Sequence, residues 1–203
     1  MKEFTQYTDS DDAGCPITRK STSSGDLLHG SHLIKSYSST QQTLALSSGE
    51  SEFYATIKAA AAALGARAMA EDLGIELGVN IATDASASKA MVSRRGFGKA
   101  KHISRCFLWI QQRIRDKEIR VTKVGTNDNP ADLGTKFLEL GKIRHLMSLL
   151  SLRWEVGSHS LGLKAAISSL RVGGAENELA GRSRRAQEGV QKCPHLNLRT
   201  LTP

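Results

Sequence analysis

The chain has 203 residues, of which 39% are hydrophobic and 24% are charged, as in an ordinary globular domain with some additional chain. No stretch is long and apolar enough to predict a transmembrane helix, and the first residues lack the apolar core of a secretory signal. Three scattered cysteines argue against a disulfide framework and predict an intracellular protein, in the cytoplasm or nucleus. The net charge of +8 suggests a polyanionic partner.

Three strands are predicted at the start of the chain. Residues 2–8 are rich in β-formers and precede the acidic run DSDD at 9–12, which predicts the first strand. Residues 13–24 are rich in Gly, Pro, Ser and Thr and predict a loop. Two short strands are then expected at 25–29 and 33–38.

A long helix is predicted over residues 49–72. The sequence SSGE at residues 47–50 places a serine three residues before a glutamate, which indicates a capping box at a helix start. Apolar residues then recur at helical spacing. The expected buried face of this helix consists of Phe53, Ile57, Ala61, Leu64 and Ala68.

Strands and helices alternate in the next part of the chain. A strand is expected at residues 79–83, and Ser86 is expected to cap a short helix that ends near residue 92. A basic, glycine-containing loop is expected at 93–100. A helix is then predicted at 101–117, with Ile103, Phe107, Ile110 and Ile114 on one stripe.

The last predicted elements complete one α/β domain. Residues 119–124 alternate like a strand, a helix is expected to begin near Asp132, and an amphipathic helix is plausible at 136–152. The order β-β-β-α-β-α-α-β-α predicts one sheet with helices packed on it, over residues 1–152. Residues 153–203 are expected to be a basic, largely disordered tail.

The positive charge is concentrated in one segment. Residues 94–123 contain ten basic and two acidic residues, an excess as large as the net charge of the whole chain, whereas residues 1–93 contain more acids than bases. This concentration favours a surface that binds nucleic acid. The alternative is a solvated helix face followed by a basic strand.

Four acidic residues stand where catalytic groups are expected. Asp9 and Asp84 end predicted strands, Glu52 lies in the first turns of the long helix, and Asp132 opens the helix after the fifth strand. Carboxylates that converge from such positions repel each other unless a divalent cation neutralises them. Oxygen ligands suit Mg²⁺ or Mn²⁺ rather than Zn²⁺, and two such ions can hold a phosphodiester for attack by water. Spacing alone does not single out these four among the 20 acidic residues.

Four blocks of sequence give these acids a context. They are YTDSDDAGC and TRKSTS at residues 7–15 and 18–23, LALSSGESEFYA at 44–55, TDASAS at 83–88, and KHI with VGTNDNPADLGTK at 101–103 and 124–136. The blocks resemble the ribonuclease H domain of copia-type retrotransposon polyproteins, which is associated with a reverse transcriptase. They come in the family's order and cover roughly residues 4–138.

The resemblance implies a ribonuclease H-like α/β fold, with a mixed five-stranded sheet flanked by helices. It implies that Asp9, Glu52, Asp84 and Asp132 are both the catalytic residues and the metal ligands. Two Mg²⁺ ions are expected, one held by Asp9, Asp84 and Asp132 and the other by Asp9 and Glu52, and Mn²⁺ can substitute. The implied reaction is endonucleolytic hydrolysis of the RNA strand of an RNA–DNA hybrid. The reverse transcriptase region of the parent polyprotein is the implied protein partner.

Further residues are candidates for contacts with the nucleic acid. Positive charge supplies most non-specific affinity for a phosphate backbone, which favours the lysines and arginines near the motifs. His102 can equally be a helix-start residue without a role, and Ser10 can be a turn residue. The candidates are Ser10, Arg19, Lys20, Lys99, Lys101, His102 and Arg105.

Departures from the family pattern keep other functions open. Asp12 stands where the family usually has Trp, Tyr37 replaces another Trp, and the loop at 125–129 has no His to assist product release. A catalytically inactive, nucleic-acid-binding relic of such a domain is therefore the alternative function. A DNA-acting nuclease or integrase of the same superfamily ranks lower, because its acidic residues have a different spacing.

Overall fold

The computed structural model describes residues 3–96, 98 and 102–153. Within these residues the chain forms one five-stranded sheet in the order β3-β2-β1-β4-β5. The predicted tail at residues 153–203 lies outside the described residues except for Arg153. Residues 97, 99 and 100 of the predicted basic loop also lie outside them.

The first three strands form an antiparallel meander. They are β1 (Glu3–Ser10), β2 (Thr22–His29) and β3 (His32–Thr40). Gly30 has a φ of +62° in the tight turn between β2 and β3, a conformation that glycine adopts without a steric cost. Strand β2 begins three residues before the predicted strand, so the predicted loop at 13–24 is shorter than expected.

The other two strands extend the sheet in parallel. Strand β4 (Gly78–Thr83) pairs with β1, and β5 (Ile119–Lys123) pairs with β4. Parallel neighbours require crossover connections, and the helices of the fold supply them. All five strands were predicted, and their pairing makes the sheet mixed.

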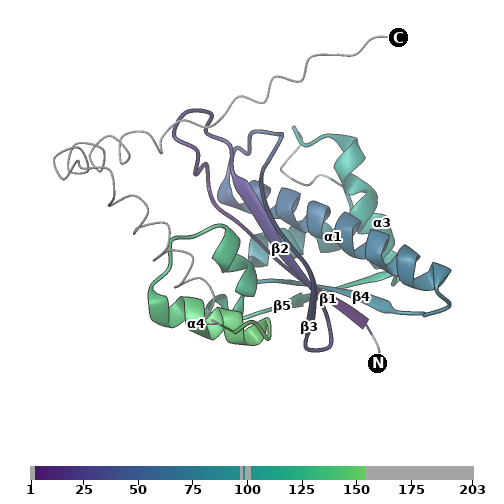
Figure 1. Cartoon of the computed structure of the whole chain (residues 1–203). Coiled ribbons are helices and arrows are strands. Elements are labelled where there is room, and N and C mark those ends of the chain that lie inside the picture. The colour runs from purple at the N-terminus through teal and green to yellow at the C-terminus, as the bar shows by residue number, and fades with distance from the viewer. Residues whose placement is uncertain (1–2, 97, 99–101, 154–203) are drawn as a thin grey trace, which may run out of the picture. The chain divides into compact units, whose positions relative to one another are not determined.

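Within the described ranges, four α-helices and three short 3₁₀-helices accompany the sheet. The α-helices are α1 (Ser48–Asp72), α2 (Ser86–Ser93), α3 (Trp109–Arg115) and α4 (Leu140–Leu149). The 3₁₀-helices are η1 (Arg105–Leu108), η2 (Thr126–Asp128) and η3 (Pro130–Gly134). Helices α1 and α3 lie on one side of the sheet and α4 on the other (Figure 1). The predicted class, a ribonuclease H-like mixed five-stranded sheet flanked by helices, is confirmed.

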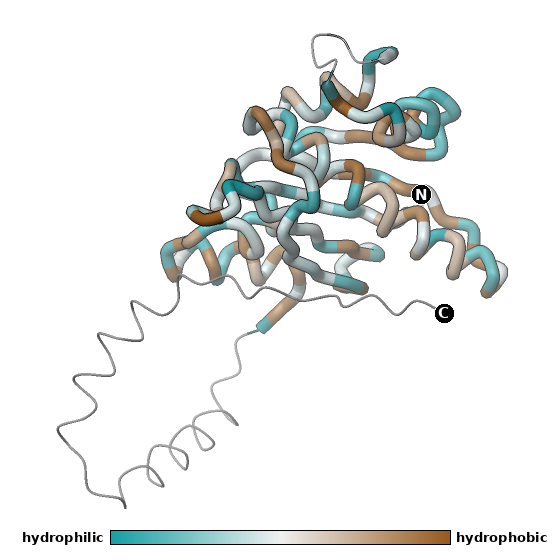
Figure 2. The backbone as a smooth tube through the Cα atoms, turned by 90° about the horizontal axis from the view of Figure 1, so that it is seen from above, coloured by the Kyte–Doolittle hydropathy of each residue, from teal (hydrophilic) through white to brown (hydrophobic). Residues whose placement is uncertain are grey.

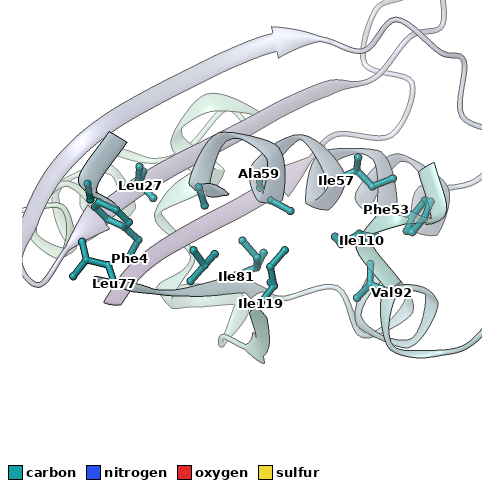
Figure 3. Close-up of a cluster of buried hydrophobic side chains, with 14 of the residues drawn as sticks. Phe4, Leu27, Phe53, Ile57, Ala59, Leu77, Ile81, Val92, Ile110 and Ile119 are labelled. Carbon is teal, nitrogen blue, oxygen red and sulfur yellow. The ribbon is translucent and has the colours of Figure 1, made fainter. Parts of the chain in front are cut away.

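The main hydrophobic core lies between the sheet and helices α1 and α3. Figure 3 shows α1 above and the strands below this core: Phe53 lies near Ile110 of α3, and Ile81 of β4 lies beside Ile119 of β5. These side chains are all buried. Full burial of each such side chain stabilises the fold by about 1.5–3 kcal/mol. The core therefore fixes α1 against β1 and β4, the elements that carry three of the four predicted catalytic acids.

The buried face of α1 differs from the predicted one. Ala61 and Ala68, which were expected inside, are exposed, whereas Ala60, Ala63 and Ala70 are buried. The five consecutive alanines at residues 59–63 are equally hydrophobic. Hydrophobic periodicity therefore carries no information about which of them face the sheet.

The predicted helix at 101–117 is also shorter than expected. The chain becomes helical only at Arg105, and Ser104 before it has extended backbone geometry with a ψ of 141°. Residues 102–104 are not helical. In this segment Ile103 is buried and His102 contacts Glu50. Tertiary contacts thus override the helical pattern of the sequence in this segment.

Two other local predictions were wrong in detail, and one was confirmed. The helix expected near Asp132 is the 3₁₀-helix η3, which begins at Pro130 and carries Asp132 in its first turn. Ser86 is the first residue of α2 instead of its cap, and its hydroxyl accepts a hydrogen bond from Lys123 Nζ at 2.7 Å. The predicted helix at 136–152 is confined to α4, because Lys136 belongs to a turn that closes back on Asp132.

Hydrophobic and hydrophilic residues are interspersed along the helices and strands, as Figure 2 shows. Within the described residues, no helix combines the length and the apolar character needed to cross a bilayer.

Candidate active site

The carboxyl ends of β1 and β4 lie side by side. The two strands are parallel, and their register pairs Thr8 with Thr83. Asp9 and Asp84 follow these paired residues, so both carboxylates reach the same edge of the sheet. Asp9 is 1% exposed and Asp84 is half-buried.

The start of α1 brings Glu52 to the same edge. The hydroxyl of Ser47 caps the helix by accepting a hydrogen bond from the backbone N–H of Glu50, as the capping box predicted. The backbone N–H of Ser10 donates to Oε1 of Glu52 at 3.4 Å, and the hydroxyl of Ser10 donates to that of Ser51 at 3.1 Å. These bonds hold the first turns of α1 against the end of β1.

Carboxylate oxygens of Asp9, Glu52 and Asp84 lie within 4.8 Å of one another. Burial, together with the charges of Asp9 and Asp84, raises the pKa of Glu52 to about 8. Burial likewise raises the pKa of Asp9. Oε2 of Glu52 is buried and has no hydrogen-bond partner within the described part of the chain. An oxygen-only cluster with such an orphaned atom fits a hard divalent cation such as Mg²⁺ or Mn²⁺.

The fourth predicted acid, Asp132, lies beside this cluster in η3. It is 2% exposed and is connected to Asp9 through Lys136. The ammonium of Lys136 donates to Oδ1 of Asp132 at 2.7 Å and to Oδ1 of Asp9 at 3.2 Å. The hydroxyl of Thr135 donates to the other oxygen of Asp9. The structure therefore brings the carboxylates of Asp9, Glu52 and Asp84 together directly. Asp132 joins them through the ammonium of Lys136.

Asn129 connects three parts of the site. Its side chain is fully buried, and its Oδ1 accepts a hydrogen bond from the N–H of Ala131 at the start of η3. Its Nδ2 donates to the backbone oxygen of Thr8 at 3.0 Å and approaches Oδ1 of Asp84 at 3.5 Å. One amide thus fixes η3 against β1 and orients the carboxylate of Asp84.

The predicted nucleic-acid contacts lie in different surroundings. Ser10 is buried, and its hydroxyl is used within the site. Arg19 and Arg105 are exposed, and Lys20 is half-buried. His102 is partly exposed and contacts Glu50. Lys99 and Lys101 lie outside the described residues.

Part of the positive charge of the basic segment at 94–123 is paired with acidic side chains. Arg113 pairs with Glu118 at 2.7 Å, and Arg120 pairs with Glu3 at 2.7 Å at the amino end of β1. Lys123 instead lies at the carboxyl end of β5, where its ammonium contacts Ser86 two residues after Asp84. The end of the segment therefore reaches the site, whereas part of its positive charge is neutralised elsewhere.

Comparison with known proteins places this geometry in context. The chain is 29% identical over 156 residues to a retrovirus-related Pol polyprotein from the transposon TNT 1-94 of Nicotiana tabacum. The match covers 76% of the chain and 11% of the polyprotein, so the chain spans about a tenth of its relative's length. No protein-family model matches. The chain is homologous to part of a retrotransposon Pol polyprotein. This homology agrees with the retrotransposon polyproteins that the motifs resemble.

Solved ribonuclease H structures also resemble the chain. LC11-RNase H1, isolated from compost, has a TM-score of 0.47 with 14% identity, over 66% of this chain and 92% of that one. The enzyme in complex with an RNA/DNA hybrid has a TM-score of 0.45 with 14% identity, over 65% and 93% of the chains. RNase H1 from Halobacterium salinarum has a TM-score of 0.42 with 18% identity, over 65% and 93%. Because these scores are below 0.5, the fold class rests on the strand order and helix positions of the chain itself.

The structure adds residues to the candidate site of this chain that the sequence did not assign. Thr135 and Lys136 belong to the block at 124–136, and the spacing of four between Asp132 and Lys136 was a usable signal. The contact of Lys136 with Asp9 spans 127 residues and had no local signal. Glu50 and Asn129 are buried polar residues, and their partners also come from distant segments.

Proposed function

We propose that this chain is a metal-dependent endonuclease of the ribonuclease H type that hydrolyses the RNA strand of RNA–DNA hybrids. The observation that carries the proposal is the mutual approach of oxygens from Asp9, Glu52 and Asp84 within 4.8 Å, with Asp132 beside them. Carboxylates are seldom buried together without a cation to compensate their charge. The motif resemblance and the homology to a Pol polyprotein support this assignment.

The cation is proposed to be Mg²⁺, with Mn²⁺ as a substitute. The division of ligands differs from the one that the resemblance implies, because the oxygens of Asp9, Glu52 and Asp84 are the ones that lie within 4.8 Å of one another. Asp9, Glu52 and Asp84 would therefore hold one ion, and Asp9 with Asp132 would hold a second. Bound divalent ions lower the pKa of a coordinated water and stabilise negative charge on the leaving oxygen. Hydrolysis adds water across the bond between phosphorus and the 3′-oxygen, which leaves and takes up a proton.

The residues of the chain contribute to this reaction by fixing the acceptor oxygens. Thr135 holds one oxygen of Asp9, the N–H of Ser10 holds Oε1 of Glu52, and Asn129 approaches Oδ1 of Asp84. Each bond leaves its carboxylate at least one further lone pair for a cation. The oxygens are therefore oriented by the protein before any ligand binds, which reduces the cost of assembling the site.

The substrate assignment rests on the motif resemblance together with charge. A protein distinguishes RNA from DNA by the 2′-hydroxyl, and phosphate contacts supply most of the affinity. Arg19 and Arg105 are exposed on described segments and are proposed to contact the nucleic-acid backbone. Lys20, Lys99, Lys101 and His102 are proposed as further contacts, and Ser10 as a residue next to the substrate. The reverse transcriptase region of a parent polyprotein is proposed as the protein partner.

Cleavage of a labelled RNA–DNA hybrid in Mg²⁺ tests the proposal. Double-stranded RNA and double-stranded DNA serve as substrate controls. Asp84→Asn is the site variant, and Asp72→Asn at the exposed end of α1 is the matched control. We expect the native chain and Asp72→Asn to cut only the RNA of the hybrid, and Asp84→Asn to lose cleavage while remaining folded.

Two results would overturn this function. A folded native chain that binds the hybrid without cutting it, in either Mg²⁺ or Mn²⁺, would be the inactive, nucleic-acid-binding relic. Cleavage of double-stranded DNA would indicate a DNA-acting nuclease of the same superfamily instead. Undiminished cleavage by Asp84→Asn would place the active site elsewhere.

A further inference from the structure

The ammonium of Lys136 occupies the space between two buried carboxylates. It lies 3.2 Å from Oδ1 of Asp9 and 2.7 Å from Oδ1 of Asp132. Lys142 is also near, at 3.7 Å from Oδ2 of Asp132. Lys136 is therefore the described cation that bridges the two acids, whereas Lys142 approaches only one of them.

This bridge neutralises charge that the protein could not otherwise bury. Asp9 and Asp132 are almost fully buried, and two carboxylates in such a site repel each other. Removing one partner from a buried ion pair is strongly destabilising, because the remaining charge is left without compensation. In the absence of a metal, Lys136 supplies the positive charge on this side of the site.

On the other side of the site, no lysine of the described residues contacts Glu52 or Asp84 at hydrogen-bond distance. Oε2 of Glu52 has no hydrogen-bond partner among the described residues, and Asp84 receives only the long contact from Asn129. A cation can therefore enter among Asp9, Glu52 and Asp84 without breaking an ion pair. A cation that joins Oδ1 of Asp9 to Oδ1 of Asp132 would take the place of the Lys136 ammonium, which donates a hydrogen bond to each of these oxygens.

We propose that Lys136 is an exchangeable internal counter-ion, which holds Asp9 and Asp132 together in the metal-free protein and competes with the second divalent cation for them. This inference rests on the proposed metal-dependent function. The side chain of Lys136 is 38% exposed, and its flexible four-carbon stem can move the ammonium into solvent by side-chain rotation. The two cation positions are therefore unequal, and the second fills only as Lys136 leaves.

Titration of the full chain with Mn²⁺, followed by electron paramagnetic resonance without nucleic acid, tests this competition. The native chain should bind one ion more tightly than the second. In Lys136→Met, the second ion should bind about tenfold more tightly, and the first should change little. Lys142→Met is the matched control, because it removes a lysine near Asp132 that does not bridge, and its effect on the second ion should be clearly smaller.

Thermal unfolding provides a second measurement. In EDTA, Lys136→Met should unfold at a lower temperature than the native chain, and saturating Mn²⁺ should restore most of the difference. Lys136→Gln, which is uncharged but keeps a hydrogen-bond donor, should shift second-ion affinity in the same direction if Lys136→Met does not fold. Unchanged or weaker second-ion binding in a folded uncharged variant would overturn the inference, as would equal effects of Lys136→Met and Lys142→Met.

These readouts separate the inference from the proposed nuclease function. If the two Mn²⁺ ions bind with the predicted unequal affinities but the hybrid is not cleaved, the nuclease function is refuted and the counter-ion role of Lys136 is supported. Cleavage by the native chain with no change of second-ion affinity in Lys136→Met would retain the nuclease and refute the counter-ion. A folded native chain that binds no Mn²⁺ would refute the counter-ion.

Discussion

The carboxylate of Glu50 and the imidazole of His102 are 2.8 Å apart, although 52 residues separate them in the chain. Glu50 also accepts hydrogen bonds from the Tyr54 hydroxyl at 2.5 Å and the Leu46 N–H at 3.0 Å. Burial would raise the pKa of Glu50, but these hydrogen bonds outweigh it and lower the pKa. Glu50 is therefore an ionised anchor, and it holds the chain at His102 beside the first turn of α1, two residues from Glu52.

A double-mutant cycle should reveal this coupling. Glu50→Ala removes the hydrogen bonds that Glu50 accepts from the Tyr54 hydroxyl and the Leu46 N–H, and it should cost about 1–3 kcal/mol of unfolding free energy. His102→Ala should cost less, up to about 1 kcal/mol, because the imidazole is half-exposed. Urea unfolding of both single variants and the double variant measures the interaction. Strict additivity of the two effects would contradict the pairing.

The stability of the metal-free protein should fall as the pH rises. The pKa of Glu52 is about 8 in the folded chain against an ordinary value of 4.5, so between these values the folded state holds a proton that the unfolded state has released. This group therefore favours folding fully only below about pH 4.5, and the contribution is lost by about pH 8. Asp9, whose pKa is also raised, acts in the same direction.

Glu52→Gln isolates that effect. In EDTA it should match the native chain near pH 4.5 and become more stable than it near pH 8, by a few kcal/mol at roughly 1.4 kcal/mol per pKa unit. Mg²⁺ should reduce the pH dependence of the native chain, because it binds the ionised carboxylates. Urea unfolding across this pH range, with and without Mg²⁺, is the measurement. Parallel pH profiles for the two proteins would refute the raised pKa.

Gly134 should tolerate no side chain. A Cβ at this position would lie 2.3 Å from Oγ of Ser24 and 2.8 Å from its Cβ, so η3 would have to move away from β2. Since η3 carries Asp132 and leads to Lys136, Gly134→Ala should reduce cleavage at least tenfold and lower the melting temperature. Gly65→Ala is the matched control, because its Cβ meets nothing within 4 Å on α1. It should stabilise the helix by about 0.5–1 kcal/mol, and equal effects of the two changes would refute the steric argument.

Asn129 should matter both for stability and for metal affinity. Asn129→Ala removes its hydrogen bonds to the backbone oxygen of Thr8 and the N–H of Ala131 and should cost about 1–3 kcal/mol. It also releases Asp84, so the first Mn²⁺ should bind more weakly. Asn127→Ala in the exposed neighbouring turn is the control and should change both quantities little. Unaltered Mn²⁺ affinity in Asn129→Ala would show that Asp84 needs no orienting partner.

Local patterns predicted most of the fold because each strand is short and bounded by turn residues. The alternating sequence at β5 and the glycine turn before β3 are clear signals of this kind. The capping serine of α1 was equally legible, and Ser47 caps the helix as expected. The buried face of α1 could not be predicted, because its run of alanines gives no preferred face.

The site divides in the same way between local and distant information. Asp9 and Asp84 could be placed because both follow predicted strands, and Glu52 because it opens a helix. The roles of Lys136, Asn129 and Glu50 depend on partners that are 127, 121 and 52 residues away. Such contacts follow from the packing of the whole sheet, and no spacing within one segment encodes them.

These distant bonds have a consequence for the order of folding. Thr8 and Asp9 near the start of the chain are joined to Asn129, Thr135 and Lys136 only when the intervening loop of more than a hundred residues has closed. Contacts between remote segments form late, because the entropy of loop closure must be lost before they stabilise anything. A growing or partly folded chain thus contains Asp9, Glu52 and Asp84 well before Asn129, Thr135 and Lys136 complete the site. Cutting activity should appear last, as a property of the finished molecule.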